Sequence, residues 1–417
     1  MKIAFIVQWF PALSESFILS QIAHMIDRGH TVEIISQYRT HETLLHPSIT
    51  QYDLLSKTAF AFSIPRNKIL RRLKAVALSA ACFFASPRRT VRLLRACWHG
   101  GNRFDFPSLF LGLKCIGKSF DVLCAHFGPS GNSGLALKRI GIAPKLIAAF
   151  HGYDIRMALA GDRNLYRELF GGADRLLANS QYTQDRLLEL GADPSIVQVH
   201  PMGIDLAQFP LRDRSIRPQD RELLILTVGR YVPEKGLEFG IRAFARLASR
   251  FSHQKARYEI IGFGPEEDKL GRLIRELRLQ EVVFLAGPKN HTEVIERLYQ
   301  ADLFLLPSVS EALGVVLLEA QAAGLPIVAT ETDGIPFAVI PGKSALLVPP
   351  ADADALADKL CWLIDNPRTW PDMIKAGREH VEAYFNIRKL NEALESLCFQ
   401  LCQGAKIENR KSAIETD

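Results

Sequence analysis

Short apolar stretches alternate with longer stretches of helical periodicity along most of this 417-residue chain. Apolar runs of strand length are predicted at 2–7, 31–36, 121–125, 145–150, 174–179 and 197–200, and again at 223–228, 258–262, 282–286, 303–306, 327–330 and 345–348. Helical patterns separate them, for example at 17–28 before the helix stop Gly29. Such alternation is typical of α/β domains with doubly wound parallel sheets.

The chain is long enough for two domains, each with its own core. Residues 206–222 are polar and contain Pro210 and Pro218, which predicts a linker. We therefore expect an N-terminal domain over 1–205 and a C-terminal domain over 223–385. A long helical pattern covers 373–402, and a flexible tail is predicted over 404–417.

Charge is distributed unevenly, although the net charge is only +6. No acidic residue occurs between Asp53 and Asp105, whereas the interval 66–103 is rich in Arg and Lys around an apolar piece at 75–85. That piece is too short to span a bilayer, which takes about 20 residues. A basic helical hairpin with aromatic residues suits an anionic membrane surface. The alternative is an ordinary solvated helix pair with a buried seam.

Other classes of partner and compartment are less well supported by the residues. No signature of a common nucleic-acid module accompanies the basic interval, so no nucleic-acid partner is expected. The seven cysteines lack CxxC spacing, which indicates neither a zinc site nor a disulfide framework and fits a reducing cytoplasm. The amino terminus is expected to form a first strand and not a signal peptide.

Candidate chemistry is densest around residues 301–336. A strand ends near Leu306, and a helix is predicted from Gly314, so backbone N–H groups around Leu313, Gly314 and Val315 would form an anion site suited to a diphosphate. Glu311 precedes this helix and Glu319 lies within it. Carboxylates here could accept hydrogen bonds from sugar hydroxyls. They could equally be a capping residue and a solvated side chain.

A second cluster follows the strand at 223–228. Arg230 and Lys235 lie at the carboxyl end of that strand, where their charges could neutralise a departing phosphate. Both clusters are expected at the same edge of one sheet. In the first half, His126 and His151 each follow a strand, at the sheet edge where ligands of parallel sheets bind, although a lone histidine there is more often structural.

The chain resembles the retaining GT-B glycosyltransferases of family 4 from residue 1 to about 390. The motifs that carry this resemblance are GRYVPEKG at 229–236, IGFGP at 261–265, the E-x7-E spacing of Glu311 and Glu319, AAGLP at 322–326 and GIP at 334–336. The resemblance implies two Rossmann-like doubly wound domains facing a cleft, with a C-terminal helix over 386–403 crossing back to the first domain.

The resemblance also implies roles for residues of the second half. Glu311 would hold hydroxyls of the transferred sugar, Glu319 would hold the ribose, and Arg230 with Lys235 would bind the diphosphate. The base pocket would lie near Gly262 to Gly264 and around 286–289. The donor would be a UDP- or GDP-linked sugar that serves as co-substrate, and neither a cofactor nor a metal is expected.

Motifs of the first half are similar to the exopolysaccharide branch of the family, with its colanic-acid and amylovoran transferases. They are FP at 10–11, SESF at 14–17, AHFG at 125–128 and FHGYD at 150–154. His151 then matches the histidine at the reacting centre, Asp154 would orient it or contact the acceptor, and Glu15 and His126 remain uncertain residues on the acceptor side. The implied acceptor is a glycan or a polyprenyl-diphosphate-linked oligosaccharide, and the implied location is the cytoplasmic face of the cell membrane.

Several features differ from the family pattern or leave alternatives open. Residues 9–16 replace the usual glycine-rich loop, so the phosphate contact there is not assigned, and Asp333 stands where glycine is common. The pair Asp352 and Asp354 resembles a metal-binding DxD, but it follows two prolines and is predicted to be a helix cap. A sugar-nucleotide epimerase on the same two-domain plan is the alternative function.

Overall fold

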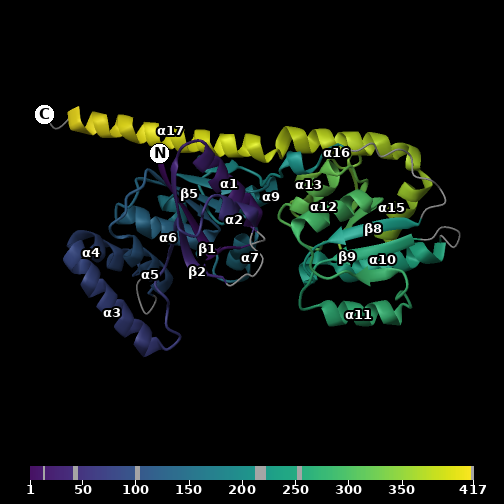
Figure 1. The fold of residues 1–417 in the computed structure, drawn as a ribbon, viewed down its shortest axis with the longest axis horizontal. Helices are drawn as coiled ribbons and strands as arrows, with labels where there is room; N and C mark the ends of the chain where they lie inside the picture. The colour runs from purple at the N-terminus through teal and green to yellow at the C-terminus, as the bar shows by residue number, and fades with distance from the viewer. Residues whose placement is uncertain (13–14, 41–45, 99–103, 212–221, 251–255, 415–417) are drawn as a thin grey trace. The chain divides into compact units, whose positions relative to one another are not determined.

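The computed structural model describes residues 1–12, 15–40, 46–98, 104–211, 222–250 and 256–414, with side chains up to residue 403 (Figure 1). The chain divides into two compact units. Unit 1 comprises Met1–His200 together with Arg388–Asp417, and unit 2 comprises Pro201–Ile387. Residues 212–221, the greater part of the expected linker, lie outside the described residues, as do Leu13 and Ser14 of the loop 9–16.

Unit 1 is built on a parallel sheet of seven described strands in the order β3-β2-β1-β4-β5-β6-β7. The strands are β1 (Lys2–Phe10), β2 (Thr31–Arg39), β3 (Thr58–Phe60), β4 (Val122–His126), β5 (Lys145–Phe150), β6 (Arg175–Ala178) and β7 (Val197–Val199). The order reverses between β1 and β4, which pair directly. Such a switch point is where open α/β sheets bind ligands, beyond the carboxyl ends of the strands.

The helices of unit 1 come mainly from the segments between strands. They are α1 (Ser16–Asp27), α2 (Pro47–Gln51), α3 (Lys68–Ala85), α4 (Pro87–Ala96), α5 (Phe106–Cys115), α6 (Gly128–Arg139), α7 (Tyr153–Ala160), α8 (Arg167–Gly172) and α9 (Gln181–Glu189). Gly29, with φ of 80°, follows α1 as predicted for a helix stop. The Asp105 carboxylate caps α5 by accepting from the Ser108 N–H at 3.0 Å.

Alternate residues of the strands enter two separate cores, one on each face of the sheet. In β1, Ala4 and Ile6 join the core with α5 and α6, whereas Ile3 and Phe5 join the core with α1 and α17 (Ile387–Ile414). Side chains of successive strand residues point to opposite faces, so a strand buried on both faces needs a continuous apolar run. This explains why these strands are visible in the sequence as uninterrupted apolar segments.

Unit 2 has a parallel sheet of six described strands in the order β10-β9-β8-β11-β12-β13. The strands are β8 (Leu223–Val228), β9 (Ala256–Ile261), β10 (Val283–Leu285), β11 (Leu303–Leu306), β12 (Ile327–Thr330) and β13 (Ala345–Val348). The helices are α10 (Leu237–Arg250), α11 (Glu267–Glu276), α12 (His291–Gln300), α13 (Val315–Ala322), α14 (Ile335–Ala338), α15 (Ala353–Asp365) and α16 (Trp370–Tyr384). The switch point lies between β8 and β11.

The two doubly wound parallel sheets confirm the predicted fold class. β5, β8, β11, β12 and β13 have the predicted bounds. β3, a strand of three residues at the sheet edge, was not predicted.

The helical pattern predicted over 373–402 is two helices, not one. α16 ends at Tyr384 and α17 begins at Ile387, because Asn386 bridges to Ile204 and takes the chain out of helical geometry. α17 packs on unit 1 through Leu394, Leu397 and Cys398. It also continues past Gly404 to Ile414, since the residues after Gly404 include good helix formers, so the tail expected over 404–417 is helical for most of its length.

The basic interval forms the helices α3 and α4, which lie at the periphery of unit 1 in dark blue (Figure 1). The two helices share a seam with buried Ala75, Ser79, Thr90 and Leu93. None of the described helices is both long and apolar enough to cross a bilayer.

Candidate active site

The loops that follow β8 and β11 are joined at the switch point of unit 2. The backbone N–H groups of Val309 and Ser310 donate to the Glu234 carbonyl at 2.8 and 3.1 Å. Gly236, with φ of 57°, lies so close that a Cβ there would be 2.2 Å from the Pro307 carbonyl oxygen. The two predicted clusters are therefore brought together by backbone contacts, which fix the positions of the side chains they carry.

Lys235 and Glu311 form an ion pair in these loops. Their side chains are 18% and 15% exposed, so the pair is only partly screened by water. Arg230 is exposed beside them at the end of β8. The structure thus places the Glu311 carboxylate against the Lys235 ammonium, which holds its orientation.

Asp333 holds the backbone of Glu311. Its carboxylate accepts from the Ser310 hydroxyl at 2.6 Å and from the Glu311 N–H at 3.0 Å. The residue has φ of 46°, a conformation that favours glycine but is tolerated by Asp. The sequence marked Asp333 as a departure from the usual glycine, but its contact with the Glu311 loop was missed because it joins residues far apart in the chain.

The amino terminus of α13 lies directly after this loop. Leu313 and Gly314 precede the helix, Val315 is its first residue, and Gly314 has φ of 78°. The first N–H groups of a helix lack intrahelical acceptors and carry partial positive charge. This arrangement fits the predicted anion site.

Glu319, one turn further along α13, pairs with a histidine that the sequence did not single out. Nε2 of His291 lies 3.0 Å from Oε1 of Glu319. The hydrogen bond to Glu319 raises the pKa of His291, against the opposing effect of burial. His291 opens α12, where Asn290 and Glu293 form a capping box, and that local signal marks the helix start but not the contact with Glu319.

The residues predicted to line the base pocket lie in the loops after β9 and β10. The Gly262 N–H donates to the Gly287 carbonyl at 3.0 Å, which joins the two loops. A Cβ on Gly262 would lie 1.9 Å from the Gly229 carbonyl oxygen, and one on Gly264 would lie 2.5 Å from that of Tyr231. Both glycines are required by close backbone approach, whether or not they contact a ligand.

In unit 1, the structure brings His126 and His151 together. Nδ1 of His126 lies 3.1 Å from Nε2 of His151, and the rings are stacked with centroids 5.4 Å apart. Burial, with a smaller effect of His200, lowers the pKa of His126 to about 3. Burial and the two neighbouring histidines also lower the pKa of His151 well below its usual value. Both rings are therefore neutral near pH 7, so one of the two facing nitrogens carries a proton and the other accepts it.

Asp154 is fully buried, and its carboxylate accepts from backbone N–H groups and not from either imidazole ring. Its carboxylate accepts from the N–H groups of Gly128, His151, Gly152 and Ile155, at 2.9–3.1 Å for the shortest contact of each. Burial raises the pKa of Asp154 to about 6, although the four N–H groups act in the opposite direction. The carboxylate thus positions the backbone of the His151 loop. The resemblance implied that Asp154 would orient the imidazole or contact the acceptor, and its hydrogen bonds are to backbone N–H groups and not to the imidazole.

Glu15 precedes α1 and is partly exposed. Two residues later, the Phe17 ring packs on His151 with centroids 4.9 Å apart.

Within the DxD-like pair, Asp352 caps α15, as predicted. The Asp352 carboxylate accepts from the Ala355 N–H at 2.9 Å, and Asp354 pairs with Arg246 at 2.8 Å. Within the described part of the chain, no group of three or more His, Cys, Asp or Glu side chains could hold a metal ion.

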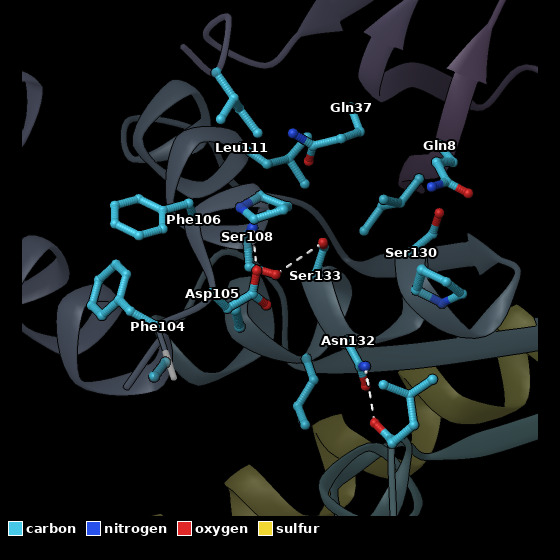
Figure 2. A pocket seen from close by; sticks show the side chains of 18 of the residues that line it. Gln8, Gln37, Phe104, Asp105, Phe106, Ser108, Leu111, Ser130, Asn132 and Ser133 are labelled. Atoms are coloured by element: carbon cyan, nitrogen blue, oxygen red, sulfur yellow. Dashed lines mark hydrogen bonds between the residues drawn. The ribbon is translucent and has the colours of Figure 1, made fainter. Parts of the chain in front are cut away.

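A large cavity, of ≈ 980 Å³, opens at the switch point of unit 1. Gln8 from β1, Gln37 from β2 and Ser130 from α6 line one end, and Phe104 and Phe106 line the other (Figure 2). Hydrogen bonds from Ser108 to Ser133 and from Asn132 to the Leu165 carbonyl fix its wall. No pattern in the sequence predicts this cavity, because α3, α5 and α6 form it by tertiary packing.

Comparison with known proteins agrees with this architecture. Residues 209–380 match the family described as glycosyl transferases group 1, and residues 14–208 match glycosyltransferase family 4. The putative colanic acid biosynthesis glycosyltransferase WcaL of Salmonella typhimurium is 34% identical over 413 residues, covering 95% of this chain and 99% of the relative. The chain is a family 4 glycosyltransferase.

Further relatives extend the match over the whole transferase. The amylovoran biosynthesis glycosyltransferase AmsK of Erwinia amylovora is 33% identical over 416 residues, covering 95% of this chain and all of AmsK. Anabaena HepE, solved in complex with UDP and glucose, superposes with a TM-score of 0.71 at 17% identity, covering 96% and 100% of the two chains. The transferase thus has the GT-B fold.

Proposed function

We propose that this glycosyltransferase transfers a hexosyl unit from a UDP- or GDP-linked sugar with retention of anomeric configuration. The observation that carries the proposal is the Lys235–Glu311 ion pair at the joined ends of β8 and β11, directly before the amino terminus of α13. It combines a carboxylate for sugar hydroxyls with positive charge for a diphosphate in one place. HepE, which was solved with UDP and glucose, shares the fold.

Each residue has a separate task in this proposal. Glu311 accepts hydrogen bonds from the sugar, and Glu319, held by His291, accepts them from the ribose. Lys235, Arg230 and the start of α13 stabilise the negative charge that develops on the leaving diphosphate. His151, neutral and stacked on His126, is the group of unit 1 that acts on the reacting sugars.

Neither a cofactor nor a metal is part of the proposed reaction. Positive charge around the diphosphate is supplied by Arg230, Lys235 and the helix start, which can replace a metal in stabilising a leaving phosphate. The supporting observation is that Asp352 and Asp354 are engaged in a helix cap and an ion pair.

We further propose a role in exopolysaccharide biosynthesis, at the cytoplasmic face of the membrane. The names of WcaL and AmsK support the pathway. α3 supports the location, because it exposes an apolar stripe that includes Ile69, Leu73, Val76 and Phe84, with Phe84 87% exposed. A stripe of this kind beside basic residues suits an anionic bilayer surface.

The experiment that separates transferase from epimerase uses purified protein with UDP- and GDP-sugars. We expect nucleotide release that depends on acceptor, and a loss of at least about 100-fold in Glu311→Gln, since removing one group that stabilises the transition state costs about that much. Circular dichroism of the variant should be unchanged. An isomerised sugar nucleotide formed without acceptor would instead identify an epimerase.

A further inference from the structure

Asp333 uses only one of its two carboxylate oxygens in hydrogen bonds to described residues. Oδ2 accepts from the Ser310 hydroxyl at 2.6 Å and from the Glu311 N–H at 3.0 Å. Oδ1 accepts from none of the described residues, and it is not buried. This second oxygen can therefore accept a hydrogen bond from a ligand.

The backbone at Asp333 has a conformation that rarely carries a side chain. Its φ of 46° lies in the left-handed region, which favours glycine. The loop does not need the carboxylate to stay in place, because the Gly334 N–H already donates to the Glu311 carbonyl at 2.8 Å. Residues in such conformations cluster at functional sites, so the side chain of Asp333 is expected to have a task of its own.

Asp333 lies beside the residue that is proposed to hold the sugar. β11 lies between β8 and β12 in the sheet, so the Glu311 loop lies between the loops that carry Lys235 and Asp333. The loops after β11 and β12 are in close contact, since a Cβ on Gly334 would lie 1.8 Å from the Ala312 carbonyl oxygen. The free oxygen of Asp333 is thus held next to the proposed position of the sugar.

The charges of these loops differ between the phosphate and the sugar. Lys235 pairs with Glu311, whereas Asp333 has no ion-pair partner in the part of the chain that the structure describes. Arg230 and Glu234 are exposed in the loop after β8. In the proposed function, the cations Arg230 and Lys235 match the two negative charges of the diphosphate. The carboxylates of Glu311 and Asp333 are then left facing the sugar, where they would repel a further negative charge.

We propose that Asp333 selects the class of donor sugar, which is a neutral hexose and not a hexuronate. A hydroxyl of the neutral hexose donates a hydrogen bond to Oδ1 of Asp333. The carboxylate of a hexuronate has no proton to donate, and it would place like charges side by side. The inference rests on the proposed transferase function, whose donor class it specifies.

Matched pairs of nucleotide sugars test this selection, because the members of a pair differ only in the group at C6. The pairs are UDP-glucose with UDP-glucuronate, UDP-galactose with UDP-galacturonate, and GDP-mannose with GDP-mannuronate. In calorimetric titration of the full-length protein, the neutral member of the pair that binds should bind at least about tenfold tighter than its uronate, since juxtaposed like charges disfavour the wrong ligand. A uronate that binds as tightly as its neutral partner would overturn the proposal.

Two variants assign the selection to Asp333. Asp333→Asn removes the charge but keeps an oxygen for the Ser310 hydroxyl and the Glu311 N–H, and Asp333→Gly restores the residue that is common in the family. Both should lower the ratio of neutral to uronate affinity at least about fivefold, because the repulsion is lost. The ratio compares two ligands on one protein, so a general loss of affinity cancels. An unchanged ratio in both variants would overturn the assignment.

Glu331→Gln is the matched control, because it removes a carboxylate from an exposed position of the same loop. It should leave the ratio unchanged. A change as large as that in Asp333→Asn would mean that the general field of the domain discriminates between the sugars, which would contradict a specific role of Asp333.

Failure of this inference can be told apart from failure of the proposed function. Wild type that transfers a hexuronate with retention would overturn the donor class alone. Wild type that binds a neutral sugar with the expected ratio but isomerises it without acceptor would leave the selection standing and overturn the transferase proposal. Wild type that binds none of the six nucleotide sugars would contradict both.

Discussion

The position of Glu311 depends on Asp333, which the sequence marked only as a departure from the family pattern. The residue types and their strand-end positions predicted that Glu311, Lys235 and Arg230 share one sheet edge, because parallel strands β8 and β11 end together. Asp333 and His291 were not predicted as partners, since each reaches the site through a contact between residues well separated in the chain. Local patterns carry no information about such contacts.

Replacing Asp333 tests whether the backbone of Glu311 must be held. We expect Asp333→Ala to lower kcat about tenfold or more with a smaller change in KM for the donor, because the Glu311 N–H loses its acceptor and the carboxylate loses its orientation. Asp333→Asn retains an oxygen acceptor and should recover part of the activity. Equal losses in both variants, or a change in KM alone, would contradict a positioning role.

The lowered pKa values of the histidines predict how the stability of the protein depends on pH. The pKa of His126 is lowered in the folded protein to about 3, so its contribution to stability is present above pH 6.5, the ordinary histidine value, and is lost as pH falls below it. The loss approaches about 1.4 kcal/mol per pH unit. Asp154, with its raised pKa of about 6, acts in the opposite direction, since its contribution is lost as pH rises from about 4 through 6.

The measurement is the free energy of unfolding of wild type and His126→Asn between pH 7.5 and 5.5. On acidification, the free energy of unfolding of wild type should fall more steeply than that of the variant. This holds whatever the difference in stability between the two proteins at pH 7.5. Parallel curves would show that His126 titrates normally in the folded protein.

At the scale of elements, the arginines of the basic helix α4 are not equivalent. The Arg89 guanidinium donates to the carbonyls of Ile116, Lys118 and Gly141 at 2.7, 3.1 and 3.1 Å, so it stabilises the turns that follow α5 and α6. Arg88, Arg92 and Arg95 are exposed, and their spacing puts them on one face of α4. The sequence predicted a single charged surface, because residue types alone do not show which arginines are exposed.

This difference gives a matched test of membrane contact. Exchanging Arg88, Arg92 and Arg95 for Gln should release the protein from anionic liposomes, because each basic residue near the surface contributes about 1 kcal/mol. The thermal midpoint should not change. Arg89→Gln should instead lower the thermal midpoint, since three backbone carbonyls lose a donor. Wild-type protein that never sediments with anionic liposomes would contradict the membrane proposal.

For the whole molecule, the sequence predicted two doubly wound parallel sheets because both sheets are buried on both faces, so that each strand is an apolar run. The GT-B class was implied by the family resemblance. It did not predict the break between α16 and α17, which is imposed by the bridge from Asn386 to Ile204. Nor did it predict the cavity of unit 1, because helices far apart in the chain enclose it. Candidate site residues at strand ends are thus more predictable than cavities between helices.

We propose that this two-unit enzyme transfers a sugar with retention and without a metal. The most direct measurement is the anomeric configuration of the newly formed bond, determined by NMR on product made with and without EDTA. We predict that wild type forms a product with the configuration of the donor at the same rate in both conditions. An inverted product, or activity abolished by EDTA and restored by manganese, would contradict this account.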